Sequence, residues 1–329
     1  TALKQLSRGS AAGPCGLRRD LLYPLCDYEG FSEVFAELVD HALANRLPER
    51  EFSMSILELI PKPNGGSRPI GMGTILRRVA AKLVAKAEVE GLREVCEAEN
   101  QYALSEKGTL RLYRKVTEAA EAGRFVVALD LRNAFNMLDR SCVKKVIEEH
   151  FGPGKDLCLK LYSNPTHFKV RGPARPEQSG GRSSASPEAR GFDLPFRLDI
   201  RKRPHYEFAT QRGVVQGCPV APLLFATAMA RTLKRVRSDL GEVDVYAFHD
   251  DVYLVATDAA ALPSAVCRLR SAFAEIGMML SPEKCQTLPP FPRATPRELA
   301  TLGGEAGSLR CMGGPVVGRY HPRREALMR

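Results

Sequence analysis

Two apolar runs of strand length, separated by a short polar break, constrain the fold of this chain more than any other feature. Residues 243–248 and 252–256 are rich in β-branched and aromatic side chains, and His249, Asp250 and Asp251 lie between them. This pattern predicts a β-hairpin. Two adjacent carboxylates at the tip of an apolar hairpin repel each other, and a divalent cation would relieve that repulsion. The alternative is a solvated Asp-Asp turn, which the pair taken alone would favour.

A further apolar run ends on a third carboxylate. Residues 125–129 read Phe-Val-Val-Ala-Leu, and Asp130 follows directly. In phosphoryl-transfer sites, carboxylates at strand ends bridge two divalent ions roughly 3.5–4 Å apart. We therefore take Asp130, Asp250 and Asp251 as the candidate metal ligands and catalytic residues.

Other periodic segments predict helices around these strands. The expected helices are 32–47 with Ser32 as a cap, a helix from about 75, 141–149, about 222–236, and 265–276 with Ser264 as a cap; a strand is expected at 54–60. Turn-forming residues fill 62–69. The order strand, helix, hairpin, helix indicates an α+β sheet with helices on one face.

The basic charge of the chain is concentrated in two segments. The net charge is +10, and residues 171–204 carry eight Arg or Lys against four Asp or Glu, while 291–329 carry seven against three. Neutralisation of phosphates by such segments is the sequence-independent part of nucleic-acid binding. A solvated loop and tail is the alternative. No run approaches the roughly 18–20 apolar residues of a membrane span, so no membrane partner is expected.

Several short motifs occur in a fixed order along the chain. They are Ala12–Leu17, Leu59–Ile70, Gln101–Tyr102, Ala128–Asp130 with Ala134–Asn136, Gln211–Gly213 with Gln216–Pro222, Phe248–Asp251, Gly277–Lys284 and Met312–Pro315. Each is weak alone, but together and in this order they resemble the reverse transcriptases of non-LTR retrotransposons, including the site-specific elements of trypanosomatids and insects.

The resemblance implies an α+β right-hand polymerase fold with fingers and palm, a ferredoxin-like palm sheet bearing the catalytic hairpin, and a thumb that is largely absent. The implied divisions are fingers with the N-terminal motif at 1–124, palm motif A at 125–139, fingers and palm helices at 140–210 with a Gly/Pro/Ser/Arg-rich insertion at 172–204, palm motifs B, C and D at 211–290, and the motif E turn with the start of a thumb or connection at 291–329.

The resemblance also implies roles for further residues. Those expected at the incoming dNTP are Lys62, Arg68, Phe135, Gln216 and Gly217, with Phe135 excluding the 2′-hydroxyl of a ribonucleotide. Outside the motifs, these would be read as a solvated basic turn, a core phenylalanine and a polar loop.

Two more roles follow from the resemblance. Lys284 is expected to donate a proton to the departing pyrophosphate, and Met312, Gly313 and Gly314 are expected to grip the primer. A surface lysine is the alternative for Lys284. His249 departs from the family pattern, which has a small or apolar residue there, and it brings bulk and possible charge to the hairpin tip.

The activity implied is that of an RNA-directed DNA polymerase using two Mg²⁺ ions, with Mn²⁺ as a substitute. Its partners would be an RNA template, a DNA primer or target and dNTPs, in the nucleus. Three alternatives stay open: a catalytically inactive, nucleic-acid-binding relic, which His249 favours; a two-carboxylate metal nuclease; and a reverse transcriptase of another lineage, such as a group II intron enzyme.

Overall fold

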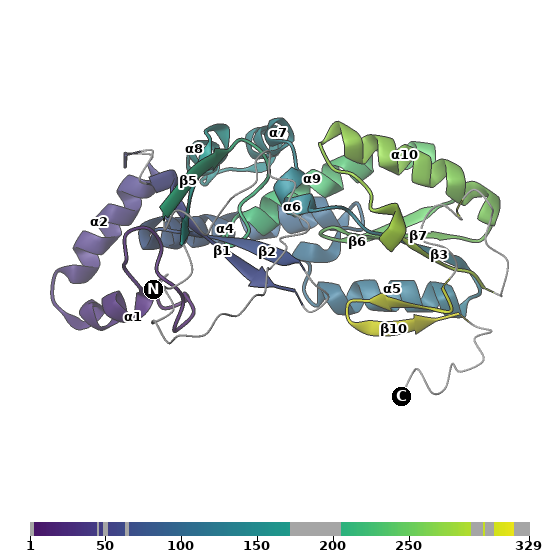
Figure 1. Ribbon diagram of the computed structural model, residues 1–329, viewed down its shortest axis with the longest axis horizontal. Coiled ribbons are helices and arrows are strands. Elements are labelled where there is room, and N and C mark those ends of the chain that lie inside the picture. The colour runs from purple at the N-terminus through teal and green to yellow at the C-terminus, as the bar shows by residue number, and fades with distance from the viewer. Residues whose placement is uncertain are drawn as a thin grey trace, which may run out of the picture. The chain divides into compact units, whose positions relative to one another are not determined.

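The computed structural model describes residues 3–44, 46–48, 52–62, 66–171, 205–290, 299 and 306–318 (Figure 1). The chain divides into two compact units. The first comprises Thr1–Val84, Asp156–Gln211 and Val215–Pro219, and the second comprises Ala85–Lys155, Arg212–Val214 and Val220–Arg329. The insertion expected at 172–204 lies outside the described residues. None of the helices that the structure describes is both long and apolar enough to cross a membrane.

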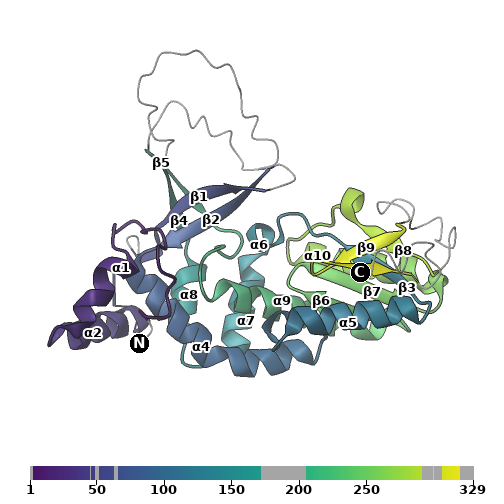
Figure 2. The same cartoon turned by 90° about the horizontal axis from the view of Figure 1, so that it is seen from below.

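A four-stranded sheet forms the centre of the first unit. Its strands are β1 (Ser55–Pro61), β2 (Ser67–Gly73), β4 (Thr166–Arg171) and β5 (His205–Thr210), in the order β2-β1-β4-β5 (Figure 2). β1 pairs with β2 as an antiparallel hairpin and with β4 in parallel. Strand β1 confirms the predicted strand at 54–60. Strand β2 was not predicted, because its Pro and two Gly residues are typical of a turn.

The first unit also contains several helices. They are α1 (Arg19–Leu22), the 3₁₀ helix η1 (Tyr23–Asp27), α2 (Phe31–Leu43), the start of α4 (Ile75–Glu97) and most of α8 (Lys155–Ser163). The predicted cap of α2 is wrong. The residue before the helix is Gly30, whose φ of 79° is left-handed and suits a residue without Cβ, so Ser32 lies inside the first turn.

The second unit contains the sheet that carries the three candidate aspartates. Its strands are β3 (Phe125–Leu129), β6 (Asp244–Phe248), β7 (Asp251–Ala256) and β8 (Gln286–Leu288), in the order β6-β7-β3-β8 with all neighbours antiparallel. Helices separate the first strand from the second and the third from the fourth, and the fourth strand lies beside the first. This is the ferredoxin-like order predicted for the palm.

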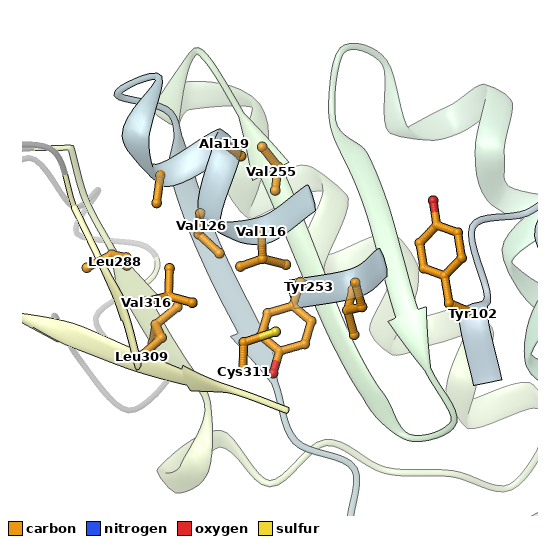
Figure 3. Packing of buried hydrophobic residues seen from close by; sticks show 12 residues of the cluster. Tyr102, Val116, Ala119, Val126, Tyr253, Val255, Leu288, Leu309, Cys311 and Val316 are labelled. Carbon is orange, nitrogen blue, oxygen red and sulfur yellow. The ribbon is translucent and has the colours of Figure 1, made fainter. Parts of the chain in front are cut away.

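One face of this sheet is covered by a helix and a second hairpin. The covering elements are α5 (Gly108–Glu121) and the hairpin of β9 (Ser308–Cys311) and β10 (Gly314–Val317). Their apolar side chains close over those of the sheet in one cluster (Figure 3), whose fully buried members include Leu112, Val116, Val126, Val255 and Val316. The alternation of strand side chains puts residues 126 and 128 of β3, and 253 and 255 of β7, on this face.

The remaining helices of the second unit are α6 (Ala134–Met137), α7 (Arg140–His150), α9 (Ala221–Val236) and α10 (Leu262–Glu275), with the 3₁₀ turns η2 (Tyr102–Leu104), η3 (Arg237–Leu240), η4 (Ala259–Ala261) and η5 (Pro282–Lys284). Helix α9 packs against both α7 and α10 and is buried on almost every side. Such all-round burial explains why its sequence is apolar beyond a single stripe.

Two predicted helix starts are corrected. Helix α10 begins at Leu262, with Pro263 in its first turn, so Ser264 is an interior residue and not the cap. Helix α7 begins one residue before Ser141, and its cap is Asp139, whose carboxylate accepts a hydrogen bond from the Ser141 N–H at 2.7 Å.

Candidate active site

The strand register of the second unit brings the three aspartates to one end of its sheet. Leu129 lies opposite Val252 in the antiparallel pairing of β3 with β7, so the next step of that register sets Asp130 opposite Asp251. Phe248 pairs with Asp251, which leaves His249 and Asp250 as a two-residue turn. The predicted hairpin is therefore confirmed, and its tip lies beside the end of β3.

The charges of these carboxylates act on one another. Burial between the strands raises the pKa of the Asp251 carboxyl to about 6, and the negative charges of Asp250 and Asp130 act in the same direction. Asp251 nevertheless keeps an exposed surface, so an ion from solvent can reach it. The site thus favours either a bound proton or a bound cation.

The donor set of this site consists of carboxylate oxygens, which suit hard divalent ions such as Mg²⁺ and Mn²⁺. Across the described ranges, however, no group of three or more His, Cys, Asp or Glu side chains is gathered tightly enough to form a metal centre. The aspartates fit a divalent ion in charge, ligand type and solvent access. Their side chains are not drawn together around one point.

Lys284 lies at the same end of the sheet. Its Nζ is 3.9 Å from Oδ1 of Asp130, and its side chain is mostly exposed. The segment that carries it is fixed to the end of β3, because the Ser281 N–H donates to the Asp130 carbonyl at 2.8 Å and the Asp130 N–H to Cys285 Sγ at 3.4 Å. The backbone therefore holds the cation near the aspartates, although the exposed ion pair itself adds little stability.

Phe135 lies in a cluster of aromatic rings beneath the hairpin tip. Its ring stacks on that of Phe225, with centroids 4.2 Å apart and an interplanar angle of 7°, and it meets His249 edge-on at 5.5 Å. Phe225 is fully buried, whereas Phe135 is partly exposed. One face of Phe135 is thus supported by the core. The stacking makes Phe135 a rigid side chain, as a residue that excludes a ribose 2′-hydroxyl would need to be.

His249 does not bring a positive charge to the hairpin tip. Its imidazole packs against Phe135, Phe225 and Phe248. Burial lowers the pKa of His249 to about 4, so the ring is neutral near pH 7, and its buried Nδ1 has no hydrogen-bond partner among the residues that the structure describes. The backbone of His249 is left-handed, with φ of 52°, which costs a non-glycine residue about 1–2 kcal/mol.

The predicted primer grip is the turn of the β9–β10 hairpin. Cys311 pairs with Gly314, so Met312 and Gly313 form a two-residue turn in which both φ angles are positive, at 51° and 87°. The Tyr113 hydroxyl of α5 donates to the Pro315 carbonyl at 3.0 Å. The hydroxyl of Tyr253, on β7, donates to the β9 carbonyl of Arg310 at 3.3 Å. These bonds fix the hairpin to α5 and to β7, the strand that begins with Asp251.

The other predicted dNTP-binding residues lie in the first unit. Lys62 and Arg68 are exposed near the turn of the β1–β2 hairpin. The Gln216 carbonyl accepts a hydrogen bond from the Gly71 N–H of β2 at 2.7 Å. Gly217 has φ of 105°, and an added Cβ would lie 2.7 Å from the Gly71 carbonyl oxygen. The structure therefore brings Gln216 and Gly217 onto the strand that carries Arg68.

Two residues of this region were not assigned a role from sequence. Gln101 and Tyr253 contact the catalytic hairpin and the β9–β10 hairpin, respectively, through hydrogen bonds to backbone groups. Gln101 is part of a recognised motif, but the motif does not say which backbone it meets. No periodicity or spacing gives that information, because both contacts join segments far apart in the chain.

Solved structures with the same fold define the class. The chain resembles apo telomerase from Candida tropicalis with a TM-score of 0.53 and 10% identity, covering 87% of this chain and 51% of that chain. The structure of apo telomerase from Candida tropicalis truncated from its C-terminal domain gives a TM-score of 0.52 at 11% identity. That match covers 88% of this chain and 59% of the telomerase chain. At such identities the likeness concerns the fold alone, and it confirms the expected right-hand polymerase fold.

A family comparison is more specific. The model of the reverse transcriptase (RNA-dependent DNA polymerase) family matches residues 60–305. The chain therefore belongs to the reverse transcriptase family. Reverse transcriptase domains generally use divalent metal ions.

Two curated relatives are retrotransposon proteins. The retrotransposable element SLACS 132 kDa protein of Trypanosoma brucei gambiense is 24% identical over 297 residues, which cover 88% of this chain and 22% of that protein. The retrovirus-related Pol polyprotein from type-1 retrotransposable element R2 of Nasonia vitripennis is 29% identical over 109 residues. These residues cover 31% of this chain and 11% of the polyprotein. The predicted resemblance to non-LTR retrotransposon enzymes is confirmed, and the chain spans only a minor part of either relative.

Proposed function

We propose that this chain is the polymerase core of a retrotransposon's RNA-directed DNA polymerase, which adds dNTPs to a primer 3′-hydroxyl on an RNA template. The observation that carries the proposal is the register that sets Asp130 opposite Asp251, with Asp250 in the adjoining turn. Family membership supplies the reaction class, and this sheet end supplies charged groups suited to it.

Asp130, Asp250 and Asp251 would hold two Mg²⁺ ions, with Mn²⁺ as a substitute. When bound, the ions would activate the attacking oxygen and neutralise charge on the departing phosphates. Burial, together with the negative charges of Asp250 and Asp130, raises the pKa of Asp251, and this supports the assignment, since a cation at the sheet end would stabilise the ionised carboxylate. The strand register already sets the backbones of these aspartates at one end of the sheet, so an ion would gather their side chains there.

The chain's other residues would bind and orient the reactants. The primer 3′-oxygen forms a bond to the α-phosphorus and loses its proton, while the bond from that phosphorus to the β-phosphate bridging oxygen breaks. Lys284, placed beside Asp130, would give a proton to the leaving pyrophosphate. Phe135, backed by Phe225, would exclude a ribose 2′-hydroxyl.

The remaining assignments concern binding. Lys62 and Arg68 would contact the triphosphate, since exposed cations beside a glycine-rich turn suit phosphate oxygens. Gln216 and Gly217 would contact the incoming nucleotide. The turn of Met312, Gly313 and Gly314 would hold the primer end, a role that its anchoring to α5 and β7 supports.

Primer extension tests the proposal. Purified protein is given poly(rA) annealed to oligo(dT), dTTP, and Mg²⁺ or Mn²⁺, and wild type is compared with Asp250→Ala and with Asp239→Asn, an exposed aspartate of η3. Extension by wild type and Asp239→Asn but not by Asp250→Ala supports a polymerase. Template binding without extension in either metal would identify a relic, and template degradation without dTTP would identify a nuclease.

We also propose that the whole protein acts in the nucleus, where a mobile element meets its DNA target. This rests only on kinship with retrotransposon proteins. Imaging of the tagged full-length protein in its own cells would test it, and exclusion from the nucleus throughout the cell cycle would refute it.

A further inference from the structure

A fully buried glutamine holds the backbone of the catalytic turn. The Gln101 side-chain Oε1 accepts a hydrogen bond from the His249 N–H at 2.8 Å, and its Nε2 donates to the His249 carbonyl at 3.1 Å. Gln101 has no exposed surface. One side chain therefore satisfies both backbone groups of the residue that precedes Asp250.

The chain places Gln101 with its backbone as well as with its side chain. After α4 ends, Asn100 adopts φ of 55°, and the Gln101 N–H returns to the Cys96 carbonyl at 3.0 Å. Gln101 then forms a parallel bridge with Ala247 of β6, whose N–H donates to the Asn100 carbonyl at 2.9 Å. Residues 100 and 101 thus pair with the edge of the strand that leads into the turn.

A third hydrogen bond fixes the side chain itself. The Ala103 N–H, in η2, donates to Gln101 Oε1 at 3.2 Å. The carbonyl oxygen of the amide is therefore shared between two N–H groups from different parts of the chain, and the orientation of its NH₂ group follows. Tyr102, in the next position, is buried in the cluster of Figure 3 and keeps this segment against the sheet.

The turn needs such support because its first residue is in an unfavourable conformation. His249 has a positive φ, and Asp250 and Asp251 follow it directly. If the turn relaxed toward negative φ, the backbone of both aspartates would move with it. The aromatic rings around His249 hold its side chain, whereas the Gln101 amide, among the described residues, bonds both its N–H and its carbonyl.

We propose that Gln101 is a positioning residue that keeps the His249–Asp250 turn in its left-handed conformation, so that Asp250 and Asp251 are presented correctly to metal ions. The inference rests on the proposed function of the two aspartates. Gln101 touches neither substrate nor metal in this account. It acts through the backbone of the turn.

Two substitutions separate positioning from packing. Gln101→Met keeps the length and volume of the side chain but removes all three hydrogen bonds. Gln101→Glu keeps an oxygen that accepts from the His249 and Ala103 N–H groups. Burial favours the protonated form of its carboxyl group, whose O–H can donate to the His249 carbonyl in place of the amide NH₂. A packing role predicts that both variants are tolerated, because both keep the volume of the side chain. A positioning role predicts that Met is damaging and that Glu is tolerated.

Thr232→Val is the matched control. Thr232 is also buried in the second unit, and its hydroxyl donates to the Ala228 carbonyl within α9 at 2.9 Å. The control therefore removes a buried hydrogen bond without touching the turn. Thermal melting of all variants shows whether a change in function is merely a loss of folded protein.

The experiment combines hydrogen exchange with metal binding. Backbone exchange of the 243–256 segment is followed by mass spectrometry, and Mn²⁺ binding to the protein is followed by electron paramagnetic resonance. We expect faster exchange in the turn and at least tenfold weaker Mn²⁺ binding in Gln101→Met, and values within threefold of wild type in Gln101→Glu and Thr232→Val. In primer extension, kcat should fall in Gln101→Met with little change in the KM for primer.

The outcomes are distinct. If Gln101→Met exchanges and binds Mn²⁺ as wild type does, while Asp250→Asn abolishes binding, the positioning role is wrong and the proposed function stands. The positioning role is also wrong if Gln101→Glu is the more damaged variant. If Asp250→Asn binds Mn²⁺ as well as wild type does, the metal site itself is wrong.

Discussion

Gly217→Ala tests how closely the Gln216–Gly217 segment approaches β2. The φ of 105° at Gly217 lies outside the left-handed well, which costs an alanine about 1–3 kcal/mol. The new Cβ would lie 2.7 Å from the Gly71 carbonyl oxygen and 3.2 Å from Ile70 Cγ2. A backbone oxygen cannot rotate away, so the segment must shift, at a further cost of about 1–3 kcal/mol. We expect the free energy of unfolding to fall by about 2–6 kcal/mol in total.

Gly9→Ala is the matched control, because Gly9 has φ of 67° and nothing within 4 Å of an added Cβ. It should cost only about 1–2 kcal/mol. Chemical denaturation measures both variants. Because the shift moves Gln216, we also expect the KM for dNTP to rise about fivefold or more in Gly217→Ala alone. Equal stability of the two variants with an unchanged KM would refute the close approach and the role it supports.

Three further variants test individual contacts. In Phe135→Ala, the loss of a wall that costs a ribose hydroxyl about 1–3 kcal/mol should lower the preference for dNTP over rNTP by about 5- to 150-fold in single-nucleotide insertion; an unchanged preference argues against the gate. Lys284→Ala should lower kcat by about 10²-fold with an unchanged melting temperature, because the side chain is exposed; Lys284→Arg, which keeps the charge but hardly releases a proton, should be nearly as slow, and wild-type rates in Lys284→Arg would exclude proton donation. Tyr253→Phe removes the hydroxyl bond to the β9 backbone and should cost about 0.5–1.5 kcal/mol in denaturation while raising the KM for primer; a change in neither quantity would mean that this bond does not hold the turn.

Strands with strong apolar runs were predictable from the sequence. The hairpin of β6 and β7 and the strand β3 follow from runs of β-branched and aromatic residues that end on carboxylates. The pairing of β3 with β7 was not predictable from those runs, because register depends on which strands meet and not on the composition of either strand. The resemblance implied a ferredoxin-like palm sheet, and the strand order of the second unit agrees with it.

Weaker elements depend on tertiary contacts. Strand β2 reads as a turn, yet glycine is required at Gly71, because an added Cβ would lie 2.5 Å from Val215 Cγ1 and 2.9 Å from Phe168 Cε1. Helix α5 was not predicted, although its buried residues 112, 116, 119 and 120 have helical spacing. The charged residues of its other face interrupt that stripe in the sequence and obscure its period.

Some site residues were predictable from the sequence, and others depend on tertiary contacts. Asp130, Asp250 and Asp251 stand at strand ends that composition alone marks. His249 was expected to bring possible charge to the tip, but the charge depends on burial, which sequence did not give. Gln101 could be recognised only as part of a motif, because its partners are backbone groups of a distant hairpin. The assigned roles of Lys62, Arg68, Gln216 and the division of the chain into 1–124 and later segments stay predictions.

The central claim is that the aspartates act as one metal-dependent unit in RNA-templated DNA synthesis. Single-turnover extension of a DNA primer on an RNA template, with Asp130→Asn, Asp251→Asn, the double variant and the exposed control Asp239→Asn, tests it most directly. The account predicts that each single variant loses about 10³-fold or more in rate, that the double variant is hardly slower, as groups acting together require, and that the control matches wild type. Retention of a tenth or more of the wild-type rate by Asp130→Asn or Asp251→Asn would contradict the account.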